Sequence, residues 1–125
     1  MANVLTMNPV TGLALGRIAI GVGALAAPDL ATKLFRLDGA NNPQLSYMIR
    51  MFGSREVALG AVTLVAKGSA RRKLVALGVL VDGADAFAGY DAMRTGAVTN
   101  SVGVGLVAPA VAAVLAGGVG VATGK

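Results

Sequence analysis

Four long stretches of apolar residues, separated by short polar segments, make up most of the chain. The first, residues 9–27, has 19 residues and would span about 28 Å as a helix, close to the roughly 30 Å hydrocarbon core of a bilayer. The pattern therefore predicts an all-α fold, a four-transmembrane-helix bundle in which residues 1–125 form a single integral membrane domain. The predicted helices cover about residues 9–27, 43–67, 70–94 and 102–122.

Capping residues mark the ends of these stretches. The Asn-Pro pairs at 8–9 and 42–43 each combine a preferred N-cap with proline at the first helical position. Ser69 can cap the third helix, and Gly68 and Gly96 can terminate the second and third. These signals predict where the four helices begin and end.

Three segments have more than one interpretation. Residues 9–27 could belong to a cleaved signal peptide, but the missing basic n-region and the interrupting Arg17 favour a retained helix. Residues 29–37 could form an amphipathic helix on the membrane surface, ended by Gly39, or an ordinary polar loop. Pro109 would leave a carbonyl of the fourth helix unpaired and kink it, and we expect packing rather than function to explain its presence.

Small residues at helical spacing predict faces where helix backbones approach closely. The first helix contains a GxxxG pair, and the fourth has a row of small residues at every fourth position. The expected packing residues are Gly12, Gly16, Ala108, Ala112, Ala116 and Gly120.

Composition agrees with a membrane protein and excludes several kinds of site. Hydrophobic residues make up 55% and charged residues 14% of the chain, against about 45–50% and about 25% in soluble domains. The chain has no Cys and no His, which excludes disulfides, Cys/His metal sites and His-based catalytic triads. We expect no metal and no catalysis independent of a partner.

The basic residues predict orientation rather than nucleic-acid binding. The net charge is +5, but four cations lie in one loop, residues 67–73, between apolar stretches. With Lys125, five cations lie on the side of the termini, against three on the other side: Lys33, Arg36 and Arg94. Both termini are therefore predicted to be cytoplasmic, in a multi-pass protein of the cell (inner) membrane.

Charged residues also occur near the centres of the predicted spans. Aligning the midpoints of the first three helices brings five ionisable residues to nearly one depth: Arg17, Arg55, Glu56, Asp82 and Asp85. Each costs roughly 2.5–3.5 kcal/mol at a helix centre, so we expect them to pair inside the bundle. Two arginines face three carboxylates, so either Arg50 reaches the cluster or one carboxylate holds a proton.

This cluster has a structural and a functional interpretation. It could only lock the packing of the helices, since buried ion pairs are weak evidence for net stability. Alternatively, it could line a polar cavity for a ligand, a quinone headgroup or a proton. Asp82 or Asp85 would then carry the proton, and Arg17 or Arg55 would contact an anion or a carbonyl.

Short motifs resemble the DoxX/DoxD-like group of small four-helix bacterial membrane proteins. They are Leu15-Gly16-Arg17, Lys33-Leu34-Phe35 and Arg55-Glu56-Val57-Ala58-Leu59-Gly60. Actinobacterial membrane proteins of unknown function have a similar character. The resemblance implies a four-helix membrane fold, places functional positions at Arg17 and Glu56, and suggests a link to quinone or thiol redox systems. The lack of Cys argues against a direct thiol role.

Three functional hypotheses follow. The first is an accessory subunit that binds a larger membrane complex or a second copy of itself, without a cofactor. The alternative is a protein that binds quinone or another small ligand, or that couples to protons. The third is a soluble helical protein unrelated to membranes. The expected partners are the lipid bilayer and a membrane protein, not nucleic acid.

Overall fold

The computed structural model describes residues 8–123, which form five α-helices and no strand. The all-α prediction is confirmed, and the four long helices begin and end within two residues of the predicted limits. The short α2 lies in the segment that could have been a polar loop. The helices are α1 (Pro9–Ala26), α2 (Pro28–Leu34), α3 (Leu45–Val65), α4 (Gly68–Arg94) and α5 (Asn100–Thr123).

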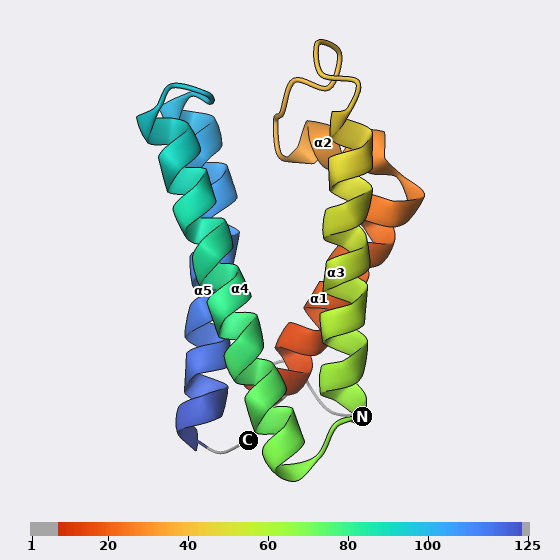
Figure 1. Cartoon of the computed structure of the whole chain (residues 1–125), viewed down its shortest axis with the longest axis vertical. Helices are drawn as coiled ribbons and strands as arrows, with labels where there is room; N and C mark the ends of the chain where they lie inside the picture. The colour runs from red at the N-terminus through yellow and green to blue at the C-terminus, as the bar shows by residue number, and fades with distance from the viewer. Residues whose placement is uncertain (1–7, 124–125) are drawn as a thin grey trace.

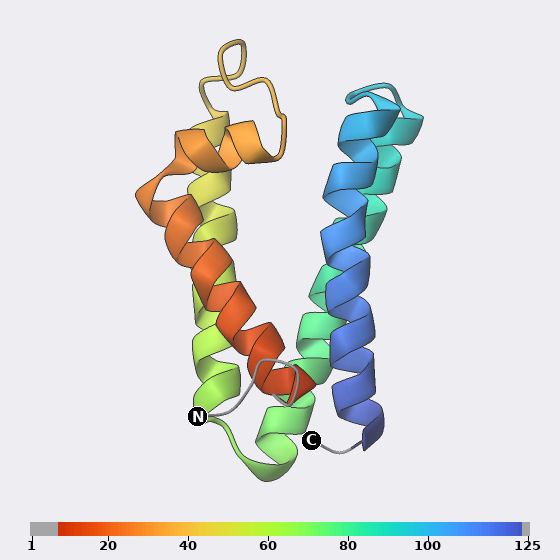
Figure 2. The same cartoon turned by 180° about the vertical axis from the view of Figure 1, so that it is seen from behind.

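The four long helices alternate in direction and form two antiparallel pairs (Figure 1). One pair is α1 with α3, and the other is α4 with α5. The pairs approach each other where α3 turns into α4 and diverge toward the end that carries α2 (Figure 2). We call the first of these the basic end, because residues 67–73 lie there, and the other the α2 end.

Glycines bring the backbones of α1 and α3 into close contact. A Cβ atom on Gly60 would lie 2.6 Å from the carbonyl oxygen of Ala14, and one on Gly53 would lie 2.8 Å from that of Gly21. Any side chain at these positions would therefore push the two backbones apart. None of these three glycines was among the predicted packing residues.

The predicted packing faces of α1 and α5 are only partly buried. In α1, the buried face contains Arg17 and extends to Val10, Ala14, Gly21 and Ala24. Gly16 is one residue, or about 100°, from Arg17, and it is exposed, while Gly12 is half-buried.

In α5, a row at every fourth position drifts by about 40° per step around a helix of 3.6 residues per turn. Ala108 and Ala112 therefore face outward, Ala116 is half-buried, and Gly120 is buried against Val10.

The capping predictions have mixed outcomes. Asn8 caps α1, because its side chain accepts a hydrogen bond of 2.8 Å from the Val10 amide. The second Asn-Pro prediction is wrong: α3 begins at Leu45, and the Asn42 amide group donates instead to the Asp38 carbonyl (2.7 Å).

At the next two boundaries, one prediction is wrong and one is confirmed. Gly68, with φ +61°, opens α4 rather than ending α3, so Lys67 and not Ser69 takes the N-cap position. Gly96 follows α4 with φ +79°, as predicted.

Two helices, α1 and α5, are long and apolar enough to cross a membrane. The other two long helices, α3 and α4, do not meet this criterion, and both carry charged residues near their centres. In α3 the central charges are Arg55 and Glu56, with Arg50 nearer the start of the helix, and in α4 they are Asp82 and Asp85. Whether those charges face water or one another therefore decides how the two helices are interpreted.

We expect Gly60→Ala to lower the free energy of unfolding by about 1–3 kcal/mol, because the added Cβ would overlap the α1 backbone. Gly16→Ala is the matched control: a Cβ there meets nothing within 4 Å. The control should be neutral or stabilise the helix by up to about 1 kcal/mol. Thermal unfolding followed by circular dichroism measures both, and equal effects would contradict the close approach of α1 and α3.

Candidate functional site

Arg17 joins three helices through its guanidinium group. Its Nη1 donates hydrogen bonds to Glu56 Oε2 on α3 (2.9 Å) and to Asp82 Oδ1 on α4 (3.0 Å), and its Nη2 donates to Asp82 Oδ2. Arg17, Glu56 and Asp82 are only 6%, 5% and 3% exposed. The bidentate pair with Asp82 uses the planar fork of the guanidinium, a geometry that Lys does not offer.

A second pair extends the cluster toward the surface. Arg55 Nη2 donates to Asp85 Oδ2 (2.7 Å) and to Glu56 Oε1 (3.3 Å). The Arg55 and Asp85 side chains are 38% and 33% exposed, so this half of the cluster reaches the outside of the bundle between α3 and α4. The Arg55 guanidinium also lies 5.2 Å from the centroid of the Phe52 ring, within the range of a cation–π contact.

Helical spacing explains how each side chain is directed. Arg55 and Glu56 are adjacent and therefore point about 100° apart, so Glu56 faces inward and Arg55 to the side. Asp82 and Asp85 are three residues apart and share one face of α4. Gly78, one turn before Asp82, lies against the guanidinium: a Cβ there would be 2.9 Å from Arg17 Nη2.

Five of the six predicted cluster residues therefore lie together. Arg50 does not reach them: it is exposed on α3 and takes part in none of the ion pairs of residues 8–123. Its position five residues before Arg55 turns it about 140° away and moves it about 7.5 Å along the helix. Gly78 was not predicted as a site residue, although its spacing of four from Asp82 placed it on the same face.

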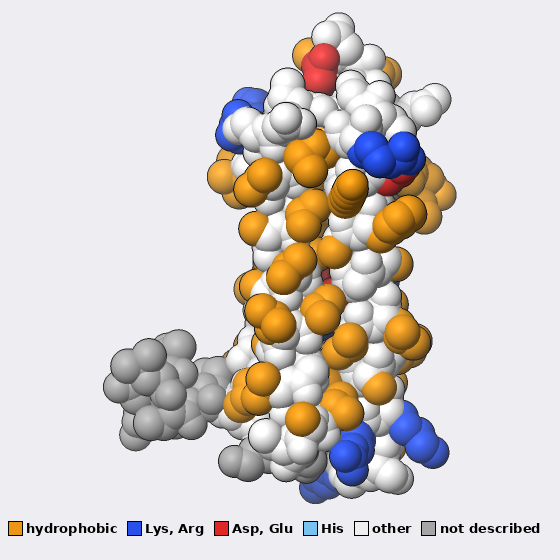
Figure 3. Space-filling model, turned by 90° about the vertical axis from the view of Figure 1, so that its left-hand side faces the viewer, with side chains coloured by type: hydrophobic (Ala, Val, Ile, Leu, Met, Phe, Trp, Pro, Cys, Tyr) orange, Lys and Arg blue, Asp and Glu red, His pale blue; other side chains and the backbone are white. Residues whose placement is uncertain are grey.

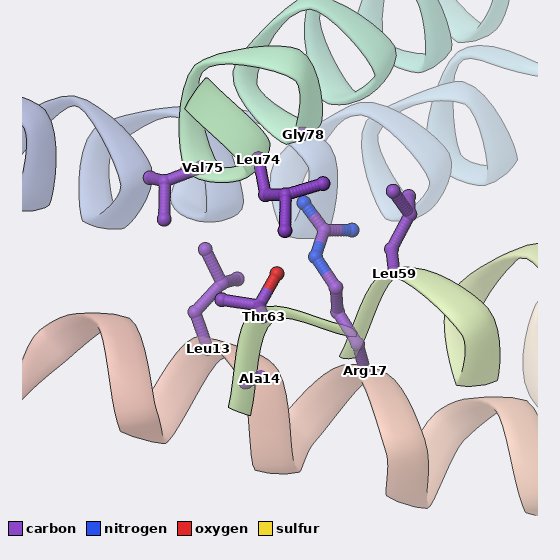
Figure 4. Close-up of a pocket in the computed structure, with 8 residues that line it drawn as sticks. All are labelled: Leu13, Ala14, Arg17, Leu59, Thr63, Leu74, Val75 and Gly78. Atoms are coloured by element: carbon purple, nitrogen blue, oxygen red, sulfur yellow. The ribbon is translucent and has the colours of Figure 1, made fainter. Parts of the chain in front are cut away.

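Little space remains beside the cluster. A cavity of about 10 Å³, room for roughly one water molecule, lies between α1, α3 and α4. Figure 4 shows the Arg17 side chain extending from α1 toward α4, with Thr63 next to it; both residues line this cavity. A larger hollow of about 320 Å³ lies at the α2 end, between residues 36–38 and 96–102.

The three carboxylates are close enough together to be considered as cation ligands. One oxygen from each of Glu56, Asp82 and Asp85 lies within 4.8 Å of the others. Guanidinium nitrogens of Arg17 and Arg55 already bind these same groups. The observed arrangement is thus an ion-pair cluster, with two guanidinium groups for three carboxyl groups.

Comparison with protein-family models, curated proteins and solved structures finds no match for the chain. The resemblance to the DoxX/DoxD-like group therefore rests on the short motifs alone. What the cluster can do chemically follows from its own groups: it can join helices, and it can hold a proton on a carboxyl group.

We expect Arg17→Leu to destabilise the protein by about 3–5 kcal/mol, because it leaves two buried carboxylates without their partner. Adding Asp82→Leu should restore part of that loss. Arg50→Leu is the control, since it removes an exposed arginine from the same helix bundle. Chemical unfolding measures all three, and a double variant no more stable than Arg17→Leu would contradict the pairing.

Proposed function

We propose that this protein is an integral membrane protein whose four long helices all cross the bilayer. Large apolar side chains on its surface support this proposal: Leu80, Phe87 and Leu115 are 71%, 72% and 65% exposed. On the face drawn in Figure 3, hydrophobic side chains occupy the length of the helices, and Lys and Arg gather at the two ends. An apolar surface this extensive is unusual for a soluble monomer.

The depth of the ion-pair cluster is the observation that carries the proposal. Pairing places Arg17, Glu56 and Asp82 at one level. Lys73 and Asp91 each lie nine residues from Asp82, or about 14 Å along the helix, on opposite sides. The ends of α1 lie eight and nine residues from Arg17. Half of a hydrocarbon core is about 15 Å, so the charged helix ends would coincide with both membrane surfaces if the cluster lies at mid-depth.

Buried pairing also accounts for Glu56 of α3 and Asp82 of α4, two of the charges that distinguish these helices from α1 and α5. Glu56 and Asp82 face Arg17 rather than lipid, so they would not prevent insertion once the bundle has formed. The four cations of residues 67–73 favour a cytoplasmic location for the basic end. Both termini would then be cytoplasmic, in the cell (inner) membrane.

Cysteine labelling tests the number of crossings, because the chain has no Cys of its own. We expect Asn41→Cys and Ala97→Cys to react with an impermeant maleimide on intact cells, and Ser69→Cys only after permeabilisation. If only α1 and α5 crossed, all three positions would lie on one side and label alike. That result would overturn the four-helix topology.

For its function, we propose an accessory subunit that docks on a larger membrane assembly or on a second copy of itself. The internal cluster is already paired, with room for about one water beside it, which argues against a ligand there. By contrast, Gly105, Ala108 and Ala112 are exposed on one face of α5. A Cβ on Gly105 would meet nothing within 4 Å, so packing within the chain does not explain this residue.

A quinone-, ligand- or proton-linked role is the second candidate. Three carboxyl groups against two guanidinium groups leave one negative charge unless a proton is bound. Arg55 and Asp85 are about one-third exposed, so the Asp85 end of the cluster is less enclosed than the Arg17 end. This role agrees with the resemblance to DoxX/DoxD-like proteins.

We expect a larger complex to be recovered from native membranes in mild detergent and to be weakened several-fold by Ala112→Leu, which would block close helix packing. Ala84→Leu makes the same change at an exposed position of α4 at similar depth and should leave the complex intact. Quantitative mass spectrometry of the purified complex measures both. A chain recovered alone with a stoichiometric quinone would instead favour the second candidate.

A further inference from the structure

We propose that the basic end binds the phosphate group of anionic phospholipids. The surface involved, which we call the basic patch, consists of Lys67, Arg71, Arg72 and Lys73, at the start of α4. This inference rests on the membrane placement proposed above and adds a specific lipid class to it.

The basic patch has no acidic side chain to neutralise it. The chain has six acidic residues, and the nearest in sequence, Asp82, is buried and paired with Arg17. None of the ion pairs found within residues 8–123 involves a cation of the patch. Four like charges within seven residues, without an ion-pair partner among residues 8–123, attract anionic headgroups when they lie next to a membrane-spanning helix.

Two of the four cations are held in place by other helices. Arg71 Nη2 donates a hydrogen bond to Thr11 Oγ1 of α1 (3.0 Å), and Arg72 Nη2 donates to the carbonyl oxygen of Val121 of α5 (3.1 Å). Arg71 Nε is buried and has no acceptor among residues 8–123. The two guanidinium groups are thus positioned against the bundle, a state that reduces the conformational entropy lost on binding an anion.

The backbone at the start of α4 adds to the positive electrostatic potential of the basic patch. The 27-residue helix α4 begins at Gly68 without a side-chain cap and without an acid in its first turn. Its first N–H groups and the positive end of its dipole face the basic end. Residues 67–70 are exposed, so a headgroup can reach them.

Depth favours a lipid over other anions. Arg71 and Lys73 lie eleven and nine residues from Asp82, or about 14–17 Å from the level of the cluster. Lipid phosphates are concentrated just outside the hydrocarbon core, whose half-thickness is about 15 Å. A soluble anion is not confined to that depth, and an acidic protein would have to reach it through the headgroups.

The test counts phospholipids bound to the full chain in neutral detergent by native mass spectrometry. We expect phosphatidylglycerol to bind more tightly than phosphatidylcholine, and Lys67→Gln/Lys73→Gln to weaken its binding by tenfold or more, at about fivefold per cation. The matched control is Lys33→Gln/Arg36→Gln, which removes two exposed cations from the α2 end and should have no effect. Lys67→Arg/Lys73→Arg should retain binding, because it keeps the charge.

Other outcomes would overturn the inference. These are equal binding of the two lipids, equal losses in the two Gln variants, or full displacement of phosphatidylglycerol by inorganic phosphate, which would indicate a free-anion site. Capture of an acidic protein without a lipid preference would indicate a protein interface instead. Maleimide labelling at Ser69→Cys and Ala97→Cys tests the four-helix topology separately from the lipid site. If the two positions lie on opposite sides of the membrane but the protein shows no lipid preference, the lipid site is rejected and the four-helix topology stands.

Discussion

The fold depends on the guanidinium group of Arg17, which binds carboxylates from two other helices at once. The two antiparallel pairs approach closely only toward the basic end (Figure 1). Between them, the Arg17–Asp82 and Arg55–Asp85 bonds join α1 and α3 to α4. A buried arginine with one partner removed would leave an uncompensated charge in a low-dielectric interior, so the cluster functions as a unit.

This constraint also sets how each helix is rotated. Arg17 must face inward, and the residues above and below it on the same face of α1 become the buried ones: Val10, Ala14, Gly21 and Ala24. Glycines on the facing helices then take the closest contacts. Gly60 and Gly53 meet the α1 backbone, and Gly78 leaves room for the guanidinium itself. The close packing and the charge cluster are thus two parts of one arrangement.

The same arrangement separates the molecule into three levels. Paired charges lie in the middle, apolar side chains cover the length of the helices, and cations concentrate at the ends. The cavity beside the cluster has a volume of only about 10 Å³, while the outer face of α5 remains bare. This contrast is why we place the proposed interactions on the surface, with a protein along α5 and with lipid phosphates at the basic end.

The sequence by itself determined the helices and the level of their charges. Apolar runs bounded by Asn8, Gly96 and similar residues indicated four long helices, and a rise of 1.5 Å per residue placed Arg17, Glu56 and Asp82 at one depth. Only the tertiary structure decided which face of each helix is buried. It turned Arg50, Gly16 and Ala112 outward and used Asn42 to bind Asp38 instead of capping α3. The reason is physical: local sequence fixes the period and rise of a helix, but the rotation of a helix about its axis is fixed by the partners that it meets.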